Sequence, residues 1–145
     1  MENRFEIFTV LINRINRNIN KIKKNEMSGH KLNAAHISCL YYLYVSEGLT
    51  STDLCEKCEE DKATISRAIE YLETNGYLMC EAKTGKRYKT PFKLTERGVR
   101  TGEKILEKVN KVLDDVSVGL TDKERKDFYR YLAIISDNLD RIAGN

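Results

Sequence analysis

The sequence is poor in residues that interrupt helices, since its 145 residues include one proline and eight glycines, and it has no tryptophan. Scarce proline and glycine, combined with abundant Leu, Ile, Lys and Glu, favour a mainly helical chain. Apolar residues never run for the roughly 18 positions that a membrane span requires, so we expect no membrane partner. The length fits a single domain with a core of its own.

A secretory signal is also missing from the beginning of the sequence. The opening residues, MENRFEIF, carry acids early and have no apolar core of the kind that directs export. We therefore expect a cytoplasmic protein. In that reducing compartment we expect thiols, and not a disulfide framework, at the four cysteines Cys39, Cys55, Cys58 and Cys80.

Catalytic patterns are absent as well. The sequence has no Gly-rich phosphate loop and no Ser/His/Asp set, and its carboxylates have the spacing of surface ion pairs. The sequence contains two histidines, which is few for a metal site, although His36 and Cys39 have a spacing that suits one. We expect no catalytic residues, no metal and no other cofactor, and hence no enzyme.

Cys55 and Cys58 lie three residues apart, a spacing that can bind zinc or form a strained disulfide. Cysteine is also a common small buried hydrophobic residue. We favour this second interpretation for both residues. A redox or zinc site at this pair of cysteines is the alternative.

Positive charge is concentrated in two regions, although the net charge is only +3. Residues 81–100 contain seven basic and two acidic side chains, and residues 11–31 contain six basic side chains and Glu26. Clustered basic side chains on a chain of otherwise balanced charge indicate one surface that binds an anionic partner. A solvated lysine-rich surface is the alternative.

Apolar residues in the first and last helices follow a heptad pattern. Alternating spacings of three and four residues run from Phe5 to Ile22, and similar seams occur between residues 99 and 116 and from Phe128 to Ile142. Seams this narrow need a partner helix, so we expect a homodimer, with an intramolecular bundle as the alternative. The residues expected at its interface are Phe5, Phe8, Ile12, Leu132, Ile135, Leu139 and Ile142.

Shorter elements are expected between these seams, and their ends have recognisable signals. Helix starts are predicted after Asn33, Thr50, Asp61, Thr95 and Thr121, with capping boxes at Thr50–Asp53 and Thr121–Glu124. The segments YLMCEA and YKTPFKLT predict two short strands joined by a turn near residues 84–86. Pro91 within the second segment indicates an edge or bulged strand.

The stretch from Asp61 to Leu78, DKATISRAIEYLETNGYL, combines one apolar stripe with a polar face. Ile65, Ile69 and Leu72 form the stripe, and a short helix and a turn precede it. This is a helix-turn-helix pattern, in which the second helix reads base edges in the major groove and the basic hairpin would lie beside the same duplex. The residues expected to contact DNA are Lys62, Ala63, Thr64, Ser66, Arg67, Lys83, Lys86, Arg87, Tyr88 and Lys89.

Three segments carry a resemblance to a known family: Leu54-Cys55, DKATISRAIEYLETNGYL and KRYKTPFKLTERG. Over essentially the whole chain, the sequence resembles the MarR family of bacterial winged-helix transcription regulators. The positions that match family patterns such as D-x-x-T-V-S-R and L-x-L-T-x-x-G are Asp61, Thr64, Ile65, Ser66, Arg67, Leu72, Gly76, Arg87, Leu94, Thr95 and Gly98.

Three positions depart from the family pattern. Lys86 stands where the wing usually has aspartate, and Tyr88 stands where it has a second arginine. The lysine adds positive charge to the wing and removes an acidic partner of Arg87, so we expect Arg87 to be less rigidly oriented. Glu60 stands at a usually apolar position, where we expect it to loosen the turn before the reading helix.

The resemblance implies a mainly α (α+β) winged helix-turn-helix fold within a single chain, 1–145. Residues 33–98 would form the DNA-binding part, and residues 1–30 and 99–145 the dimerisation helices. It also implies recognition helices in successive major grooves and a wing that reaches the minor groove through Arg87. A small-molecule effector would bind in a cleft whose candidate residues are Ile12, Ile15, Ile37, Tyr41 and Val109.

We therefore expect a sequence-specific transcriptional regulator that binds double-stranded DNA as a homodimer on a pseudopalindromic operator and acts as a ligand-responsive repressor. One alternative is a redox- or metal-switched regulator of the same fold, which is distinguished by whether oxidant or zinc changes operator affinity. A dimeric interaction module without DNA binding is the alternative from another class. The intact Thr64, Ser66, Arg67 and Arg87 argue against that alternative.

Overall fold

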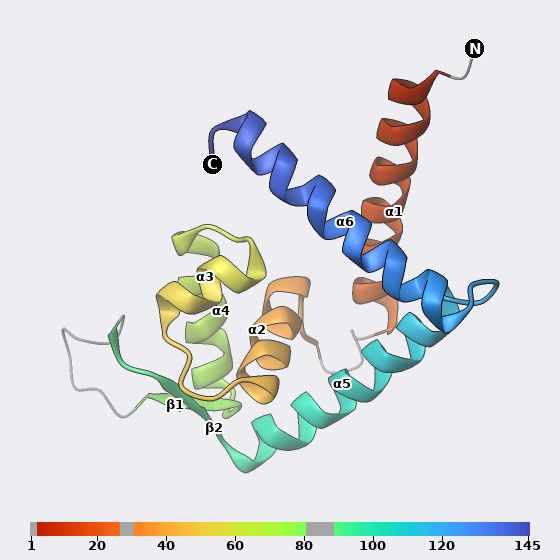
Figure 1. Cartoon of the computed structure of the whole chain (residues 1–145). Coiled ribbons are helices and arrows are strands. Elements are labelled where there is room, and N and C mark those ends of the chain that lie inside the picture. Colours follow the sequence, from red (N-terminus) through yellow and green to blue (C-terminus); the bar gives the residue numbers. More distant parts are fainter. Residues whose placement is uncertain (1–2, 27–30, 81–88) are drawn as a thin grey trace. The chain divides into compact units, whose positions relative to one another are not determined.

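The computed structural model describes residues 3–26, 31–80 and 89–145, with only the backbone of residues 25 and 26. These residues form six helices and two short strands (Figure 1). Their bounds are α1 Arg4–Glu26, α2 Ala34–Val45, α3 Ser51–Cys58, α4 Lys62–Thr74, β1 Leu78–Cys80, β2 Phe92–Leu94, α5 Glu96–Val116 and α6 Asp122–Ala143. The mainly helical fold with a small sheet that the sequence predicts is confirmed.

The chain is divided into two compact units, Met1–Lys108 and Val109–Asn145. The first unit holds α1 to α4, both strands and most of α5, while the second holds the end of α5 and α6. Among the helices in the described ranges, none is long and apolar enough to cross a membrane.

The helices α2, α3 and α4 begin where the sequence predicts. The side chains of Asn33, Thr50 and Asp61 each accept a hydrogen bond from the backbone N–H three residues later, at 2.9, 3.3 and 2.7 Å. Each bond satisfies a donor that the first turn of a helix leaves without an intrahelical partner. α6 begins similarly at Thr121, but the Thr121 hydroxyl donates to the Glu124 carboxylate at 2.9 Å, and the predicted reciprocal capping box is only half formed.

The core of the first unit lies where α2, α3 and α4 pack against one another (Figure 1). The predicted stripe of Ile65, Ile69 and Leu72 on α4 is buried there, which confirms the inward face of this helix. Burial of each such side chain contributes roughly 1.5–3 kcal/mol, so the core fixes which face of α4 remains in solvent. Other core side chains are Cys39, Leu40, Leu54, Tyr77 and Leu78.

The two strands pair antiparallel, with Leu78 opposite Leu94. The Phe92 N–H donates a hydrogen bond to the Leu49 carbonyl at 3.0 Å, so the segment before α3 adds one backbone bond to the sheet. Pro91, which was expected within the second strand, lies immediately before β2. A proline has no N–H to donate to a strand ladder, and β2 begins only after it.

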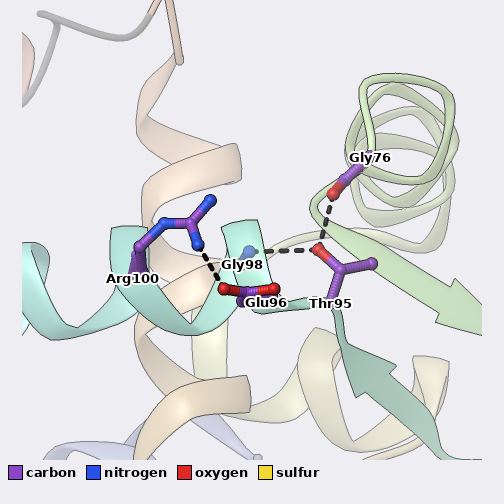
Figure 2. Close-up of polar contacts among 5 residues, drawn as sticks. All are labelled: Gly76, Thr95, Glu96, Gly98 and Arg100. Carbon is purple, nitrogen blue, oxygen red and sulfur yellow. Dashed lines mark hydrogen bonds and ion pairs between the residues drawn. The ribbon is translucent and has the colours of Figure 1, made fainter.

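Thr95 joins β2 to α5 (Figure 2). Its hydroxyl donates a hydrogen bond to the Gly76 carbonyl and accepts one from the Gly98 N–H at 3.1 Å, and its own N–H donates to the Tyr77 carbonyl at 3.1 Å. A Cβ at Gly98 would lie 2.0 Å from that carbonyl oxygen. The threonine and glycine of the L-T-x-x-G pattern thus let α5 pass close to the turn that ends α4.

Apolar side chains are exposed on both terminal helices. The seven residues predicted at a dimer interface have exposed fractions from 37% at Ile135 to 78% at Phe5 and Ile142, and no residue of α6 is buried. α1 also exposes Ile7, Val10 and Leu11, which lie outside the predicted heptad seam. Exposed apolar faces of this extent are typical of interaction surfaces.

Candidate nucleic-acid interface

The N-terminal half of α4 presents a polar face to solvent. Lys62, Ala63, Ser66 and Arg67 are exposed and Thr64 is half-buried, while the opposite face packs into the core. All five residues of this helix that were predicted to contact DNA therefore lie together. The small side chains of Ala63, Thr64 and Ser66 would allow the helix backbone to approach a groove closely.

Asp61, Thr64 and Arg67 form a chain of hydrogen bonds along this face. The Asp61 carboxylate accepts from the Thr64 N–H at 2.7 Å, and the Arg67 guanidinium donates to the Thr64 hydroxyl at 3.4 Å. Hydrogen bonds from the Thr64 backbone and hydroxyl lower the pKa of the Asp61 carboxyl, which favours its anionic form. The D-x-x-T-x-x-R spacing therefore both starts the helix and orients its arginine.

The other end of α4 is held by Arg97 of α5. The Arg97 guanidinium donates to the Asn75 carbonyl at 2.7 Å and to the Tyr77 hydroxyl at 3.1 Å. Asn75 is the C-cap residue of α4, so Arg97 ties the end of this helix to the start of α5. The sequence analysis did not identify Arg97, because no sequence motif distinguishes it from the other basic residues of its region.

His36 connects α2 to α4. Its Nδ1 accepts a hydrogen bond from the Asn33 N–H at 3.0 Å, and its ring stacks on that of Tyr71 with 4.2 Å between centroids. Burial lowers the pKa of His36, and an accepting Nδ1 requires the unprotonated form. The histidine is thus a capping residue, a role that its position three residues after Asn33 indicated and that the sequence analysis missed.

The turn between α3 and α4 is acidic and tight. Glu56, Glu59 and Glu60 are exposed there, and Glu59 has a left-handed backbone with φ 54°. The Glu60 N–H donates to the Cys55 carbonyl at 3.2 Å, which closes the end of α3. The Glu60 side chain lies in solvent and its backbone closes a hydrogen-bonded turn, contrary to the expectation that this residue loosens the turn.

The wing contributes one described residue to the predicted interface. Lys89 lies just before β2 and is exposed. The remaining wing positions, together with the predicted turn at residues 84–86, lie outside the described residues, and their contacts stay predictions from sequence: Lys83, Lys86, Arg87 and Tyr88.

The cysteines differ from their predicted arrangement. Cys55 and Cys58 are only half-buried, while Cys39 of α2 is completely buried. The interpretation as a buried hydrophobic residue therefore describes Cys39 and is wrong for Cys55 and Cys58. The neighbouring Cys39 thiol lowers the pKa of Cys58, and the Cys58 thiol together with burial raises the pKa of Cys39. In the part of the chain that is described, no group of three or more His, Cys, Asp or Glu side chains could hold a metal ion.

The residues predicted for an effector cleft are distributed over three helices. Ile12 and Ile15 are exposed on α1, Ile37 and Tyr41 are buried and half-buried on α2, and Val109 is half-buried on α5. Val109 belongs to the second unit and the other four to the first. A shallow hollow on α1 includes none of them and is lined by Glu6, Ile7, Val10 and Leu11.

Three packed helices, the third with an exposed polar face, followed by a two-stranded sheet, define a winged helix-turn-helix protein. Residues 30–87 match the model of the MarR family. This part of the chain is thus similar to the MarR family, as the sequence motifs predicted, and the fold of solved MarR family regulators is shared over nearly the whole chain. No curated protein sequence matches the chain.

Similar solved structures extend over almost the full chain. A MarR family regulator from Neisseria meningitidis, NMB1585, is 21% identical with a TM-score of 0.83, covering 99% of this chain and 98% of that one. MepR of S. aureus in a complex with DNA is 16% identical with a TM-score of 0.80, covering 94% and 99%. BpsR of Bordetella bronchiseptica, whose DNA binding is regulated by 6-hydroxynicotinic acid, is 22% identical with a TM-score of 0.76, covering 89% and 98%.

Proposed function

We propose that the chain is a sequence-specific regulator that binds double-stranded DNA, with α4 in the major groove. The observation that carries this proposal is the exposed face of α4 on which Thr64 orients Arg67. An arginine can donate two hydrogen bonds to guanine, and a threonine can contact a thymine methyl or a base edge. MepR, which has the same fold, is known in a complex with DNA.

Basic side chains at the start of α4 and in the wing supply the contacts to phosphate. Lys62 and Lys89 are exposed on the described part of the first unit, and the sequence adds Lys83, Lys86 and Arg87 in the wing. Such contacts position a protein on the duplex without reading its sequence. Arg87 is assigned to the minor groove, where a narrow A·T-rich stretch attracts arginine.

The regulator acts as a homodimer on a pseudopalindromic operator. The exposed apolar faces of α1 and α6 support this assembly, because they would otherwise remain in water. Two-fold symmetry places two copies of α4 in successive major grooves, about one helical turn or roughly 10 base pairs apart. The acidic turn before α4 would disfavour a register in which that turn faces phosphates.

A small effector relieves repression. BpsR, which is similar in fold, has DNA binding regulated by 6-hydroxynicotinic acid, and this supports a small-molecule response here. The candidate cleft residues remain Ile12, Ile15, Ile37, Tyr41 and Val109. Regulation by ligand requires that the effector binds the DNA-free arrangement more tightly than the DNA-bound one.

The test is a selection of duplexes from a random library with the full chain, followed by sequencing. The expected result is enrichment of one motif with two inverted half-sites whose centres are about one helical turn apart. Full-length Arg67→Ala serves as the matched control and should enrich the motif poorly. Recovery of no common motif by the wild-type chain would favour the interaction module without DNA binding.

A further inference from the structure

We propose that Arg97 of α5 is a positioning residue for DNA reading. It fixes the angle between α4 and β1, the first strand of the wing, so that the helix and the wing meet one duplex in register. This inference rests on the proposed function, in which α4 reads base edges and the wing contacts the same duplex. Arg97 itself is assigned no contact with DNA.

The C-terminal end of α4 has no cation of its own, because no basic residue lies in the last turn of this helix. The last carbonyl groups of a helix lack intrahelical partners and form the negative end of the helix dipole. Arg97 supplies a cation from another helix, since its guanidinium donates to the carbonyl of the C-cap residue Asn75 at 2.7 Å. This charge-assisted bond joins the start of α5 to the end of α4.

The same guanidinium also holds the residue that leads into the wing. Tyr77 immediately precedes β1, and its hydroxyl accepts from Arg97 at 3.1 Å, while the guanidinium carbon lies 4.3 Å from the centroid of its ring. The Tyr77 ring is buried and therefore fixed by the core. A planar guanidinium with several donors can stack on a ring and bond two acceptors at once, which the compact ammonium of a lysine cannot do.

The connection that Arg97 spans contains a glycine. Between Asn75 and Tyr77 lies only Gly76, whose φ of 77° allows the sharp change of direction from helix to strand. Thr95 contacts this connection after the helix has ended, at the Gly76 carbonyl (Figure 2) and at the Tyr77 carbonyl. Arg97 adds the C-cap residue of the helix itself. Its two bonds therefore lie on opposite sides of the bend and restrict the angle there.

A change at this bend acts on the reading residues over a long distance, because Thr64 and Arg67 lie toward the opposite end of α4. At about 1.5 Å per residue, the stretch from Thr64 to Asn75 spans roughly 16 Å. A tilt of about 5° at Asn75 therefore moves Thr64 by more than about 1 Å, enough to break a hydrogen bond to a base edge. Attraction to phosphates acts over about 10 Å and tolerates such a shift. Loss of Arg97 should therefore weaken sequence reading and leave non-specific binding intact.

The test compares the affinity of full-length variants for a duplex recovered by the selection with their affinity for a random duplex. Circular dichroism first confirms that each variant is folded. Arg97→Ala should lower the ratio of the two affinities about 10-fold, within the range for residues that couple two parts of a protein. Its salt slope on the random duplex should equal that of the wild type, because no phosphate contact is lost.

The matched control is Arg100→Ala, one turn further along α5. It removes a basic residue of the same helix whose ion pair with Glu96 is exposed (Figure 2). This variant should keep the wild-type ratio of affinities. An equal fall in the ratio for Arg100→Ala and Arg97→Ala would show an effect of charge on α5 and overturn the proposal.

Arg97→Lys separates positioning from charge. Lysine keeps the positive charge near the end of α4 but cannot hold Asn75 and Tyr77 together, so its ratio should fall nearly as far as that of Arg97→Ala. A wild-type ratio in Arg97→Lys, with a salt slope about one smaller in Arg97→Ala, would make Arg97 a phosphate contact and overturn the proposal.

Tyr77→Phe tests the same contact from the other side, and it serves as the test if Arg97→Ala fails to fold. It removes the hydroxyl that accepts from Arg97 and keeps the ring, so the ratio should fall in the same direction and by less. The double variant should lose no more than Arg97→Ala alone, because both changes act through one contact. Additive losses would contradict this shared action.

The two proposals fail in different ways. If folded Arg97→Ala and Tyr77→Phe both kept the wild-type ratio, Arg97 would serve stability alone, and the proposed function would stand without it. If the wild type bound both duplexes equally, the proposed function would fail, and the role of Arg97 in reading would fail with it.

Discussion

The guanidinium carbon of Arg97 lies 4.3 Å from the centroid of the Tyr77 ring, and one of its nitrogens donates to the hydroxyl of the same ring at 3.1 Å. A single exposed side chain thus contacts both the face and the polar tip of a ring that is 2% exposed. The bond from Arg97 to the Asn75 carbonyl extends this contact to the end of α4.

Replacement of Arg97 by alanine should therefore lower the free energy of unfolding by about 1–2 kcal/mol, because it removes two charge-assisted hydrogen bonds and a cation–π contact. Arg100→Ala is the control, since its ion pair with Glu96 is exposed and worth about 0.5 kcal/mol. Urea denaturation of both variants measures the difference. Equal losses would show that Arg97 is an ordinary surface cation.

The close approach of α5 to the turn after α4 makes a second prediction. Gly98→Ala would place a Cβ 2.0 Å from the Tyr77 carbonyl oxygen, and the resulting shift of α5 should destabilise the protein by about 1–3 kcal/mol or more. Glu103→Ala, at an exposed position of the same helix, should change stability by less than about 0.5 kcal/mol. Thermal unfolding that ranks the two variants the other way would refute the packing described for α5.

Stability should also fall in mild acid because of His36. Its pKa is lowered in the folded state, so the unfolded chain binds more protons below its ordinary value of 6.5. The contribution of His36 to the free energy of unfolding is then fully present above about pH 6.5. It decreases as the pH falls through the folded pKa, by about 1.4 kcal/mol per unit of difference between the unfolded and folded pKa.

The control for this pH dependence is His36→Gln, because glutamine at this helix position can accept the same capping bond without titrating. Urea denaturation at pH 8 and pH 5.5 should show a larger loss in the wild type than in His36→Gln. Identical losses would mean that His36 is not the group responsible.

Dimerisation should depend on the exposed seam of α1. The wild type is expected to sediment at twice its chain mass of 16.8 kDa, and Ile12→Asp should dissociate it or unfold it, because a charge would be buried against apolar side chains. Asn13→Asp adds the same charge one position away, on a different face of α1, and should remain dimeric. A stable wild-type monomer at micromolar concentration would contradict the assembly.

The sequence predicts much of the fold because its signals are local. Caps at Asn33, Thr50 and Asp61 depend on residues three positions apart, and the stripe on α4 depends on helical periodicity, so both can be read directly. The contacts of Arg97 with Tyr77 and with Asn75 join residues 20 and 22 positions apart. Such pairs depend on how the helices pack, and no periodic pattern specifies them.

The features of the candidate interface also include some that the sequence predicts and some that depend on packing. The exposed residues of α4 follow from the position of its apolar stripe, which sets the opposite face by geometry. The orientation of Arg67 by Thr64 also follows from their spacing of three residues. The stacking of His36 on Tyr71 could not be predicted, since it joins residues 35 positions apart.

The central claim is that α4 reads DNA sequence, and a salt titration of variants on selected and random duplexes tests it most directly. Thr64→Ala and Arg67→Ala should each weaken binding to the selected duplex by about 1–3 kcal/mol per half-site, and affect the random duplex less. Lys89→Ala is the contrasting control. It should weaken binding to both duplexes similarly and reduce the salt slope by about one for each phosphate that is no longer neutralised. If Thr64→Ala and Arg67→Ala kept wild-type discrimination between the duplexes, α4 would not be the reading helix.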